Sequence, residues 1–494
     1  MNSCILCLLA AAAALTVRAE VKLNGLFTDG AVLQQNREIP VWGTGREGEK
    51  VKVKLGAQEA SATVRDGRWM IRLKPLKAGR PLTLTVSGDN TIMLTNILIG
   101  EVWLCSGQSN MGFQLYRSEN ADEAIRTAND PELRLFTVPH HAEDQPMTDV
   151  SGSWRASAPL TASNFSAVAY FFGRDLRRAL KVPIGLIDSS VGGTPAEAWT
   201  PRDALEGNPD LKKVLERHAD AVKSYDPARA KEKYDLAAKE YSEAVKRAKA
   251  EGKNPPRAPA RPSDPARATR RPSCLYNAMI APLEPYAIAG TIWYQGEANS
   301  GRAAEYEILF PAMIASWRKA WGQGDFPFLF VQIAPNERMS PEIREAQLHT
   351  WQKVPKTALA VSVDVGTAND IHPRKKEPVG GRLALAAQAI AYGKNIEYSG
   401  PVLESMAVKE DRAVLSFTHV GRGLVAMGGE LKGFTISADG EHFHPAKAEI
   451  KGHNVEVYSR EVPMPVAVRY GWANVPDCNL SNEECLPASP FRTR

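Results

Sequence analysis

The most informative segment of this chain is Gly100-Glu101-Val102-Trp103-Leu104-Cys105-Ser106-Gly107-Gln108-Ser109-Asn110-Met111. Its apolar run over 102–104 ends abruptly in small and polar residues, which is typical of a buried strand that stops at the rim of a parallel sheet. Ligands bind beside the carboxyl ends of such strands in open α/β sheets. We therefore predict that Ser109 is a nucleophile presented at that rim.

The chain beyond residue 98 alternates between apolar, strand-like runs and helical patterns, which is the signature of an α/β fold. Besides 102–105, strands are predicted over 183–189, 288–294, 327–333 and 358–365. Helices are predicted over 166–180, 305–321 and 382–392, the first with Ser166 as a candidate N-cap. Several strands end in polar or glycine-bearing loops, as the active-site edge of a three-layer sandwich requires.

Short alternating segments on both sides of this region predict two β domains. Residues 20–98 contain strands at 51–55, 69–73 and 82–86 with turn residues between them, which indicates a small antiparallel sandwich. We interpret it as a packing domain and keep carbohydrate binding as the alternative. Residues 401–494 form the second, C-terminal β domain, which leaves 99–400 as the catalytic domain.

Residues 203–272 interrupt the α/β pattern. The segments 210–223 and 228–251 are charged, Ala-rich and helical in period, with one narrow apolar stripe. They predict a helical hairpin that lies on the domain surface. A strap rich in Pro and Arg follows over 255–272. We interpret this insertion as a decoration, with a lid over the site as the alternative.

Length and composition limit the class of protein. A chain of 494 residues is too long for a single core. The apolar run at 5–15 and the small residues at 17 and 19 predict that 1–19 is a secretory signal peptide, and hence a secreted or periplasmic protein. No later segment reads as a membrane span. A net charge of +5 without a dense basic cluster argues against a nucleic-acid partner.

Four cysteines remain after the predicted cleavage, and their spacing with His suggests no metal site. Cys105 lies in the predicted buried strand and is interpreted as a small buried thiol. Cys478 and Cys485 flank a polar loop, so a local disulfide is predicted in an oxidising compartment.

Further polar residues at predicted strand ends complete a candidate esterase site. A serine attacks an ester only when a base removes its proton and donors hold the oxyanion. Asp370 and His372 lie on one loop, and residues i and i+2 of an extended segment point the same way, so this loop can supply a base and its orienting acid. Gly192 and Gly193 offer unhindered backbone amides, and Gln295 offers an amide side chain, for the oxyanion hole.

Four strings of sequence carry a resemblance to a known family. They are GEVWLCSGQSNM at 100–111, VGGTPAEAW at 191–199, IWYQGEAN at 292–299 and DIHPRKK at 370–376. Together they resemble the sialate O-acetylesterase family of SGNH-type hydrolases. The resemblance extends to 26–35 near the start and to 468–474 and 486–492 near the end, and so covers the mature chain apart from the insertion.

The resemblance implies a three-layer α/β/α catalytic domain and a Ser-His-Asp acyl-enzyme mechanism without metal or organic cofactor. It implies Ser109 as nucleophile, His372 as general base and acid, and an oxyanion hole from the Ser109 amide, the 192–193 loop and Gln295. SGNH enzymes commonly carry the acid three residues before the His, where this chain has Asn369. Asp370 is our choice for the acid, and Asp364 is its rival.

The implied substrate is an O-acetylated sugar, most favourably a sialic acid. An esterase for acetylated xylan or pectin is the first alternative, because fold does not fix substrate. A secreted, non-catalytic carbohydrate-binding protein is the second. A nucleotide-binding protein is disfavoured because no phosphate-binding glycine motif is present. An anionic sugar needs a cation, and Lys375 and Lys376 are candidates, although a solvated loop is the favoured interpretation of both.

Overall fold

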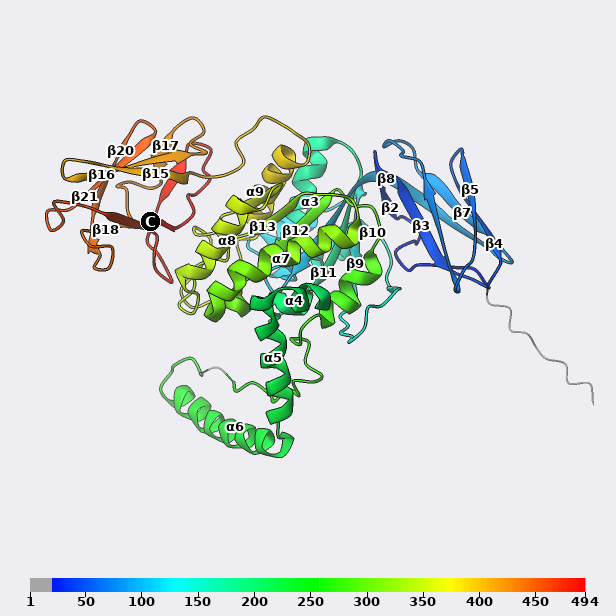
Figure 1. The fold of residues 1–494 in the computed structure, drawn as a ribbon, viewed down its shortest axis with the longest axis horizontal. Coiled ribbons are helices and arrows are strands. Elements are labelled where there is room, and N and C mark those ends of the chain that lie inside the picture. Colours follow the sequence, from blue (N-terminus) through cyan, green and yellow to red (C-terminus); the bar gives the residue numbers. More distant parts are fainter. Residues whose placement is uncertain (1–19, 257, 494) are drawn as a thin grey trace, which may run out of the picture.

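The computed structural model describes residues 20–256 and 258–493, so the predicted signal peptide over 1–19 lies outside the described residues. The middle of the chain forms a mixed α/β body, and two all-β parts lie at opposite ends of it (Figure 1). The mixed α/β class predicted from the sequence is confirmed. In the described part of the chain no helix is long and apolar enough to cross a membrane.

The central sheet has the strand order β10-β9-β11-β8-β12-β13-β14. Neighbours from β9 to β14 are parallel, and β10 is an antiparallel edge strand. The strands are β8 (Thr91–Gly107), β9 (Asp130–Thr137), β10 (Arg155–Ser157), β11 (Ile184–Ser190), β12 (Gly290–Tyr294), β13 (Phe328–Val331) and β14 (Thr357–Ala360). The chain adds β9 and β11 on one side of β8 and then β12 to β14 on the other. The loops after β8, β11 and β12 therefore meet at a topological switch point, where open α/β sheets bind ligands.

Sequence prediction found most of these strands. Those over 183–189, 288–294 and 327–333 are confirmed as β11, β12 and β13. The strand predicted over 358–365 ends at Ala360, because the chain turns away there, and β9 was not predicted.

Helices cover both faces of this sheet. On one face, α3 (Ala167–Leu180) and α9 (Glu377–Ile390) share a core cluster with Trp103 and Cys105. On the other, α7 (Ala303–Trp321) and α8 (Pro341–Lys353) share a cluster with Leu104. Successive side chains of β8 thus enter opposite layers, as the two-residue period of a strand requires. Ser166 caps α3 as predicted, since its Oγ accepts the Ala169 N–H at 3.1 Å.

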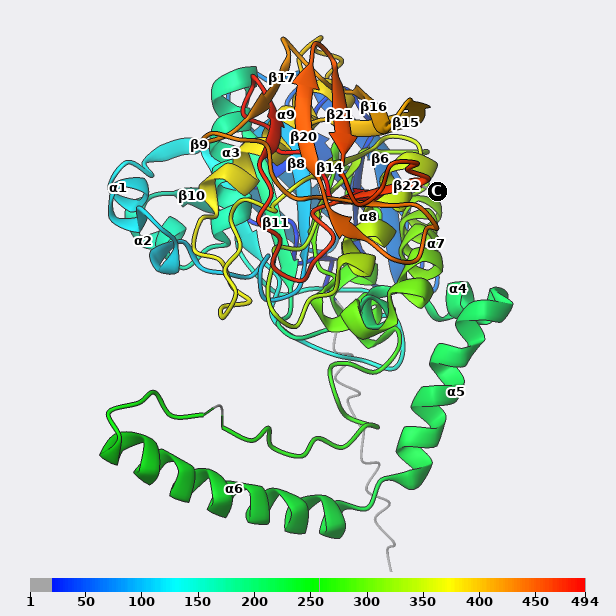
Figure 2. The ribbon, with the colours of Figure 1, turned by 90° about the vertical axis from the view of Figure 1, so that its left-hand side faces the viewer.

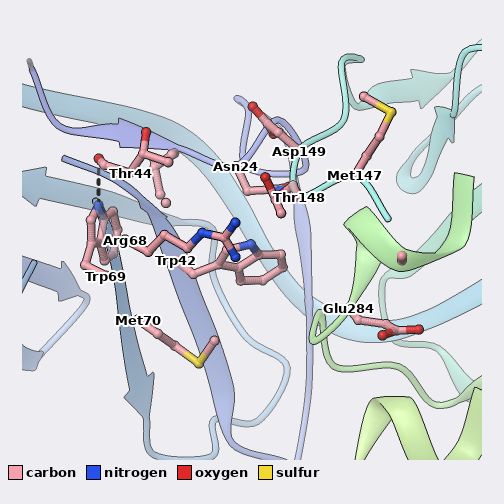
Figure 3. Close-up of a pocket in the computed structure, with 13 residues that line it drawn as sticks. Asn24, Trp42, Thr44, Arg68, Trp69, Met70, Met147, Thr148, Asp149 and Glu284 are labelled. Carbon is pink, nitrogen blue, oxygen red and sulfur yellow. Dashed lines mark hydrogen bonds between the residues drawn. The ribbon is translucent and has the colours of Figure 1, made fainter. Parts of the chain in front are cut away.

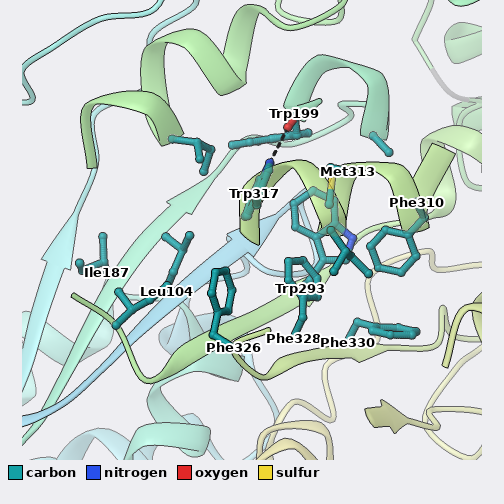
Figure 4. Packing of buried hydrophobic residues seen from close by; sticks show 14 of the residues in the cluster. Leu104, Ile187, Trp199, Trp293, Phe310, Met313, Trp317, Phe326, Phe328 and Phe330 are labelled. Atoms are coloured by element: carbon teal, nitrogen blue, oxygen red, sulfur yellow. Dashed lines mark hydrogen bonds between the residues drawn. The ribbon is translucent and has the colours of Figure 1, made fainter. Parts of the chain in front are cut away.

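An aromatic cluster fixes the loop after β11 against α7 (Figure 4). The Trp293 ring lies 5.7 Å from that of Trp317 and 6.0 Å from that of Trp199, both in T-shaped geometry. Trp317 Nε1 also donates to the Trp199 carbonyl at 2.9 Å. Trp199 ends the short helix η2 (Ala196–Trp199), which follows Gly192 and Gly193. Packing in the core therefore positions a loop of the candidate site.

The N-terminal β part shares a strand with the α/β body. Its strands are β1 (Lys22–Leu23), β2 (Val32–Gln34), β3 (Ile39–Thr44), β4 (Lys50–Leu55), β5 (Gln58–Thr63), β6 (Arg68–Leu73) and β7 (Leu82–Ser87). The 17-residue β8 pairs with β7 over its first half and with β11 and β12 over its second. The predicted boundary between residues 98 and 99 falls inside this strand. Gln34 Nε2 donates to the buried Glu101 carboxylate at 2.8 Å, which links the two parts further.

A hollow of about 430 Å³ lies where the N-terminal β part meets the body (Figure 3). Trp42 and Arg68 line it from the β part, and Asp149 and Glu284 line it from the body. Burial raises the pKa of Glu284 to about 8, although the Tyr276 hydroxyl donates a hydrogen bond to this carboxylate.

The insertion forms α4 (Arg202–Gly207), α5 (Pro209–Ser224) and α6 (Pro227–Ala250). The predicted helices are confirmed, but the predicted hairpin on the domain surface is wrong. Figures 1 and 2 show α6 standing away from the body, with the return segment running beside it. Tyr225 and Asp226 are extended and redirect the chain before α6. Ala248 is the one buried residue among those of α6 that the structure describes.

The C-terminal β part contains β15 (Val402–Lys409), β16 (Arg412–Thr418), β17 (Leu424–Ala426), β18 (Phe434–Ser437), β19 (His444–Pro445), β20 (Lys447–Lys451), β21 (Asn454–Tyr458), β22 (Ala467–Tyr470), β23 (Leu480–Asn482) and β24 (Phe491–Arg492). The predicted disulfide is wrong, since Cys478 and Cys485 are both free thiols. Cys478 packs beside Gly471 before β23, whereas Cys485 is exposed in the turn after β23, so the strand separates them. Cys105 is fully buried, as predicted.

Candidate active site

Ser109 lies in a tight turn just beyond the carboxyl end of β8. Gly107 has φ +139°, and a Cβ there would lie 2.2 Å from the Tyr294 carbonyl oxygen, so the strand end needs glycine. The Gln108 N–H donates to that same carbonyl at 2.9 Å, and the Gln108 carbonyl accepts the Met111 N–H at 2.9 Å. These bonds turn the chain at Ser109, which is half-buried between the ends of β11 and β12.

His372 reaches Ser109 from the loop between β14 and α9. Its Nε2 lies 2.8 Å from Ser109 Oγ, within hydrogen-bond distance of a nucleophile and its base. The Phe113 ring is stacked on the imidazole at 6.4 Å and 29°. Two residues separated by 263 positions in sequence are thus brought into direct contact, as the sheet-edge argument predicted.

The two candidate acids occupy different environments. Asp370 Oδ1 accepts the His372 backbone N–H at 2.9 Å and lies 3.9 Å from His372 Nδ1, and its side chain is 59% exposed. Asp364 instead accepts two hydrogen bonds from the guanidinium of Arg382, at 2.7 and 2.6 Å. Asp370 therefore lies within ion-pair reach of the imidazole, while the carboxylate of Asp364 is engaged by a largely buried arginine.

Backbone amides surround the serine on the β11 side. A Cβ on Gly192 would lie 3.4 Å from Ser109 Cβ, which places the 192–193 loop directly beside the serine, and Gly193 has φ +72°. Within the described chain, the backbone N–H groups of Ser109, Gly192 and Gly193 donate to no protein acceptor. Such groups can hold an oxyanion without prior rearrangement.

Gln295 does not offer its amide to Ser109. Its Nε2 donates to the Thr194 carbonyl at 3.2 Å and to Asn299 Oδ1 at 2.7 Å, and the side chain is fully buried. Both amide hydrogens are thereby used within the protein. Asn299 Oδ1 also accepts the Ala196 N–H at 2.9 Å. In this geometry the Gln295 amide supports the loop that carries Gly192 and Gly193.

A buried polar network behind Ser109 was not predicted. Asn110 Nδ2 donates to Glu297 Oε1 at 2.5 Å and to the Ile371 carbonyl at 3.0 Å, and Asn110 Oδ1 accepts a hydrogen bond from Lys376 Nζ. The network ties the residue after the serine to the residue before His372. Burial lowers the pKa of Lys376 to about 7, although the Glu297 carboxylate opposes this shift, and burial raises the pKa of Glu297.

The interpretation of Lys376 as part of a solvated loop is wrong. Its side chain is fully buried, and its ammonium lies over the rings of Phe113 and Tyr294, at 4.8 and 5.1 Å. Lys375 is exposed, as that interpretation expected. The strings at 100–111 and 370–376 contained Asn110 and Lys376, but nothing in their local pattern indicated that these side chains meet. No group of three or more His, Cys, Asp or Glu in the described residues is arranged to hold a metal ion.

Comparisons with known proteins identify the family of this chain. A family model described as "Carbohydrate esterase, sialic acid-specific acetylesterase" matches residues 267–389. The chain is 32% identical over 513 residues to the sialate O-acetylesterase of Rattus norvegicus, covering 92% of this chain and 90% of that protein. It is 31% identical over 512 residues to the Homo sapiens enzyme, covering 91% and 88%.

A solved structure extends the comparison. The crystal structure of a carbohydrate acetylesterase from Xanthomonas citri matches with a TM-score of 0.82 at 36% identity, covering 96% of this chain and 99% of that one. Matches of this extent make the protein a carbohydrate esterase. Its identity to the rat and human enzymes exceeds 30% over nine tenths of its length. The chain belongs to the sialate O-acetylesterase family.

Proposed function

We propose that this protein removes O-acetyl groups from sugars, most favourably from O-acetylated sialic acid, through a Ser-His-Asp acyl-enzyme mechanism. The observation that carries the proposal is the 2.8 Å contact between Ser109 Oγ and His372 Nε2 at the carboxyl edge of the sheet. The catalytic domain is proposed to be of the three-layer SGNH type. The predicted signal peptide over 1–19 leads us to propose a secreted or periplasmic enzyme.

The mechanism has two acyl-transfer steps. His372 Nε2 takes the proton of Ser109 Oγ as that oxygen bonds to the acetyl carbonyl carbon. The oxyanion accepts hydrogen bonds from the backbone N–H groups of Ser109, Gly192 and Gly193. The bond from carbon to the sugar oxygen then breaks, and the imidazolium returns its proton to that oxygen. Water, deprotonated by His372, releases acetate in the second step, and Asp370 stabilises the imidazolium in both.

The first alternative substrate is acetylated xylan or pectin, because a shared fold serves several acetylated sugars. The second alternative is a non-catalytic carbohydrate-binding protein. The close contact of Ser109 with His372 disfavours it, since a binding module needs no activated serine.

Acetate release tests the proposal. Wild-type protein should release acetate from an O-acetylated sialoside faster than from acetylxylan or acetylated pectin. Ser109→Ala and His372→Ala should each lower kcat by several orders of magnitude, because the pair acts as a unit. The exposed residues Ser153 and His140 offer matched controls, and Ser153→Ala and His140→Ala should keep the parent rate. Full activity in folded Ser109→Ala would refute the mechanism.

A further inference from the structure

Two arginines at the mouth of the site lack the acidic partners that neighbouring arginines have. Arg117 and Arg374 are exposed, and in the described part of the chain no carboxylate lies within ion-pair distance of either. Nearby, Arg174 pairs with Asp175 and Glu377 at 2.8 Å, and Arg178 lies 3.7 Å from Asp175. Neither the Arg117 nor the Arg374 guanidinium is therefore engaged in an ion pair within the described chain, so both can attract an anion.

Arg117 is tied to the catalytic histidine through an aromatic ring. It ends the short helix η1 (Leu115–Arg117), which follows the turn that carries Ser109. Its guanidinium carbon lies 4.6 Å from the centroid of the Phe113 ring, and the His372 ring is stacked 6.4 Å from that same centroid. Laid end to end, these distances bring the guanidinium within 11.0 Å of the imidazole. Arg117 and His372 therefore pack on the same aromatic ring.

Arg374 is held on the same rim by the main chain. Its Nε donates to the Arg117 carbonyl at 3.0 Å, and its own carbonyl accepts the Glu119 N–H at 2.8 Å. It is two residues from His372, so their Cα atoms are at most about 7.6 Å apart. The terminal Nη groups of Arg374 donate to no acceptor in the residues that the structure describes. The two guanidinium groups thus belong to one rim beside the imidazole.

We propose that Arg117 and Arg374 form a subsite for the carboxylate of an O-acetylated acidic sugar. The proposal rests on the proposed deacetylation and adds which sugars are accepted. A guanidinium offers paired N–H donors that match the two oxygens of a carboxylate. Lys376 cannot take this role, since its buried ammonium donates to Asn110. Sialic acids and galacturonic acid carry a carboxylate, whereas the xylose units of xylan do not.

Binding without turnover tests the subsite directly. In the Ser109→Ala background, we would titrate the methyl glycoside of N-acetylneuraminic acid and its uncharged carboxamide by calorimetry. The methyl glycoside of galacturonic acid and its carboxamide form the second pair. The acid form should bind about tenfold or more tightly than the carboxamide, because a charge-assisted hydrogen bond is lost in the latter. The double variant Arg117→Gln/Arg374→Gln should bring that affinity ratio close to one. Arg155→Gln, at an exposed arginine outside the site, should leave the ratio unchanged.

The outcomes separate the two proposals. A ratio lost for the sialoside alone identifies a sialic acid subsite, and one lost for galacturonate alone identifies a uronic acid subsite. A ratio near one for both acids in Ser109→Ala with both arginines intact, or a ratio that survives the double variant, overturns the subsite. Deacetylation is measured separately, as acetate release from acetylated substrates by protein that keeps Ser109. Protein that binds the acids through Arg117 and Arg374 but releases no acetate would refute the proposed function and leave the subsite standing.

Discussion

Asp370→Asn should slow the esterase only modestly, in contrast to the loss expected for a buried triad acid. Asp370 Oδ1 lies 3.9 Å from His372 Nδ1, and the Asp370 side chain is 59% exposed. Two unit charges about 4 Å apart interact by about 1 kcal/mol in water and by about 4 kcal/mol at an effective dielectric constant near 20. With more than half of the carboxylate in solvent, the lower part of that range applies.

A loss of about 1–2 kcal/mol in stabilising the imidazolium corresponds to roughly a 5- to 30-fold lower kcat/KM. The assay is hydrolysis of 4-nitrophenyl acetate by wild-type and Asp370→Asn protein, with the melting temperature measured in parallel. Asparagine keeps an acceptor for the His372 backbone N–H at 2.9 Å, so the loop should keep its shape and the melting temperature should hold.

Asp364→Asn is the matched control. It disrupts the paired hydrogen bonds to Arg382, whose side chain is only 9% exposed, and so should lower the melting temperature while kcat stays within about threefold. Two results would refute the reasoning. One is a loss of about 10⁴-fold in Asp370→Asn with unchanged stability, and the other is a larger loss of kcat in Asp364→Asn than in Asp370→Asn.

Three further changes probe the surroundings of the site. Ser166→Ala removes the N-cap of α3 and should lower the free energy of unfolding by about 1–2 kcal/mol in a urea titration, whereas an unchanged midpoint would contradict the capping role. Glu284 keeps its proton in the folded protein up to pH about 8, while the unfolded chain loses it near the ordinary carboxyl pKa, so unfolding free energy falls as pH rises between these values. Glu284→Gln should therefore raise the melting temperature at pH 8.5 and leave it nearly unchanged at pH 4, and equal effects at both would exclude this cause. Lys376→Met breaks the hydrogen bond to Asn110, so it should lower the melting temperature and should reduce kcat on 4-nitrophenyl acetate by about tenfold or more. Lys375→Met is the exposed control and should change neither quantity.

The sequence identified what depends on strand ends and missed what depends on tertiary packing. Ser109 and His372 could be paired because polar residues that follow parallel strands gather at one edge. The role of Gln295 could not be judged, because its amide meets Asn299 only once the short helix η5 (Glu297–Arg302) folds back. Lys376 follows two exposed cations in sequence, and its burial arises from tertiary contacts with Phe113, Tyr294 and Asn110.

In the insertion, too, local sequence predicted the longer helices but not their arrangement. Its two longer helices, α5 and α6, follow from composition and period and were predicted, whereas α4 was not. The direction of α6 is set by the extended backbone of Tyr225 and Asp226. The spacing of apolar residues does not predict such a change of direction. The short helices α1 (Ala121–Arg126) and α2 (Pro159–Ser163) were also not predicted, since each is too brief for a repeat of apolar positions to be visible.

The unbroken course of β8 limits how this protein can be divided. A chain cut at residue 98 would remove β7, which pairs with β8, and Gln34, which holds the buried carboxylate of Glu101 and accepts the Val102 N–H. Glu101 lies on the strand that leads to Ser109, so the cut would remove hydrogen-bond donors of this carboxylate eight residues from the nucleophile. Recombination between two relatives at this point would join the first half of β8 from one protein to the second half from the other, so the strands that pair with β8 would come from different proteins. Residues 20–98 and the hydrolase body are therefore expected to be inherited, expressed and unfolded together.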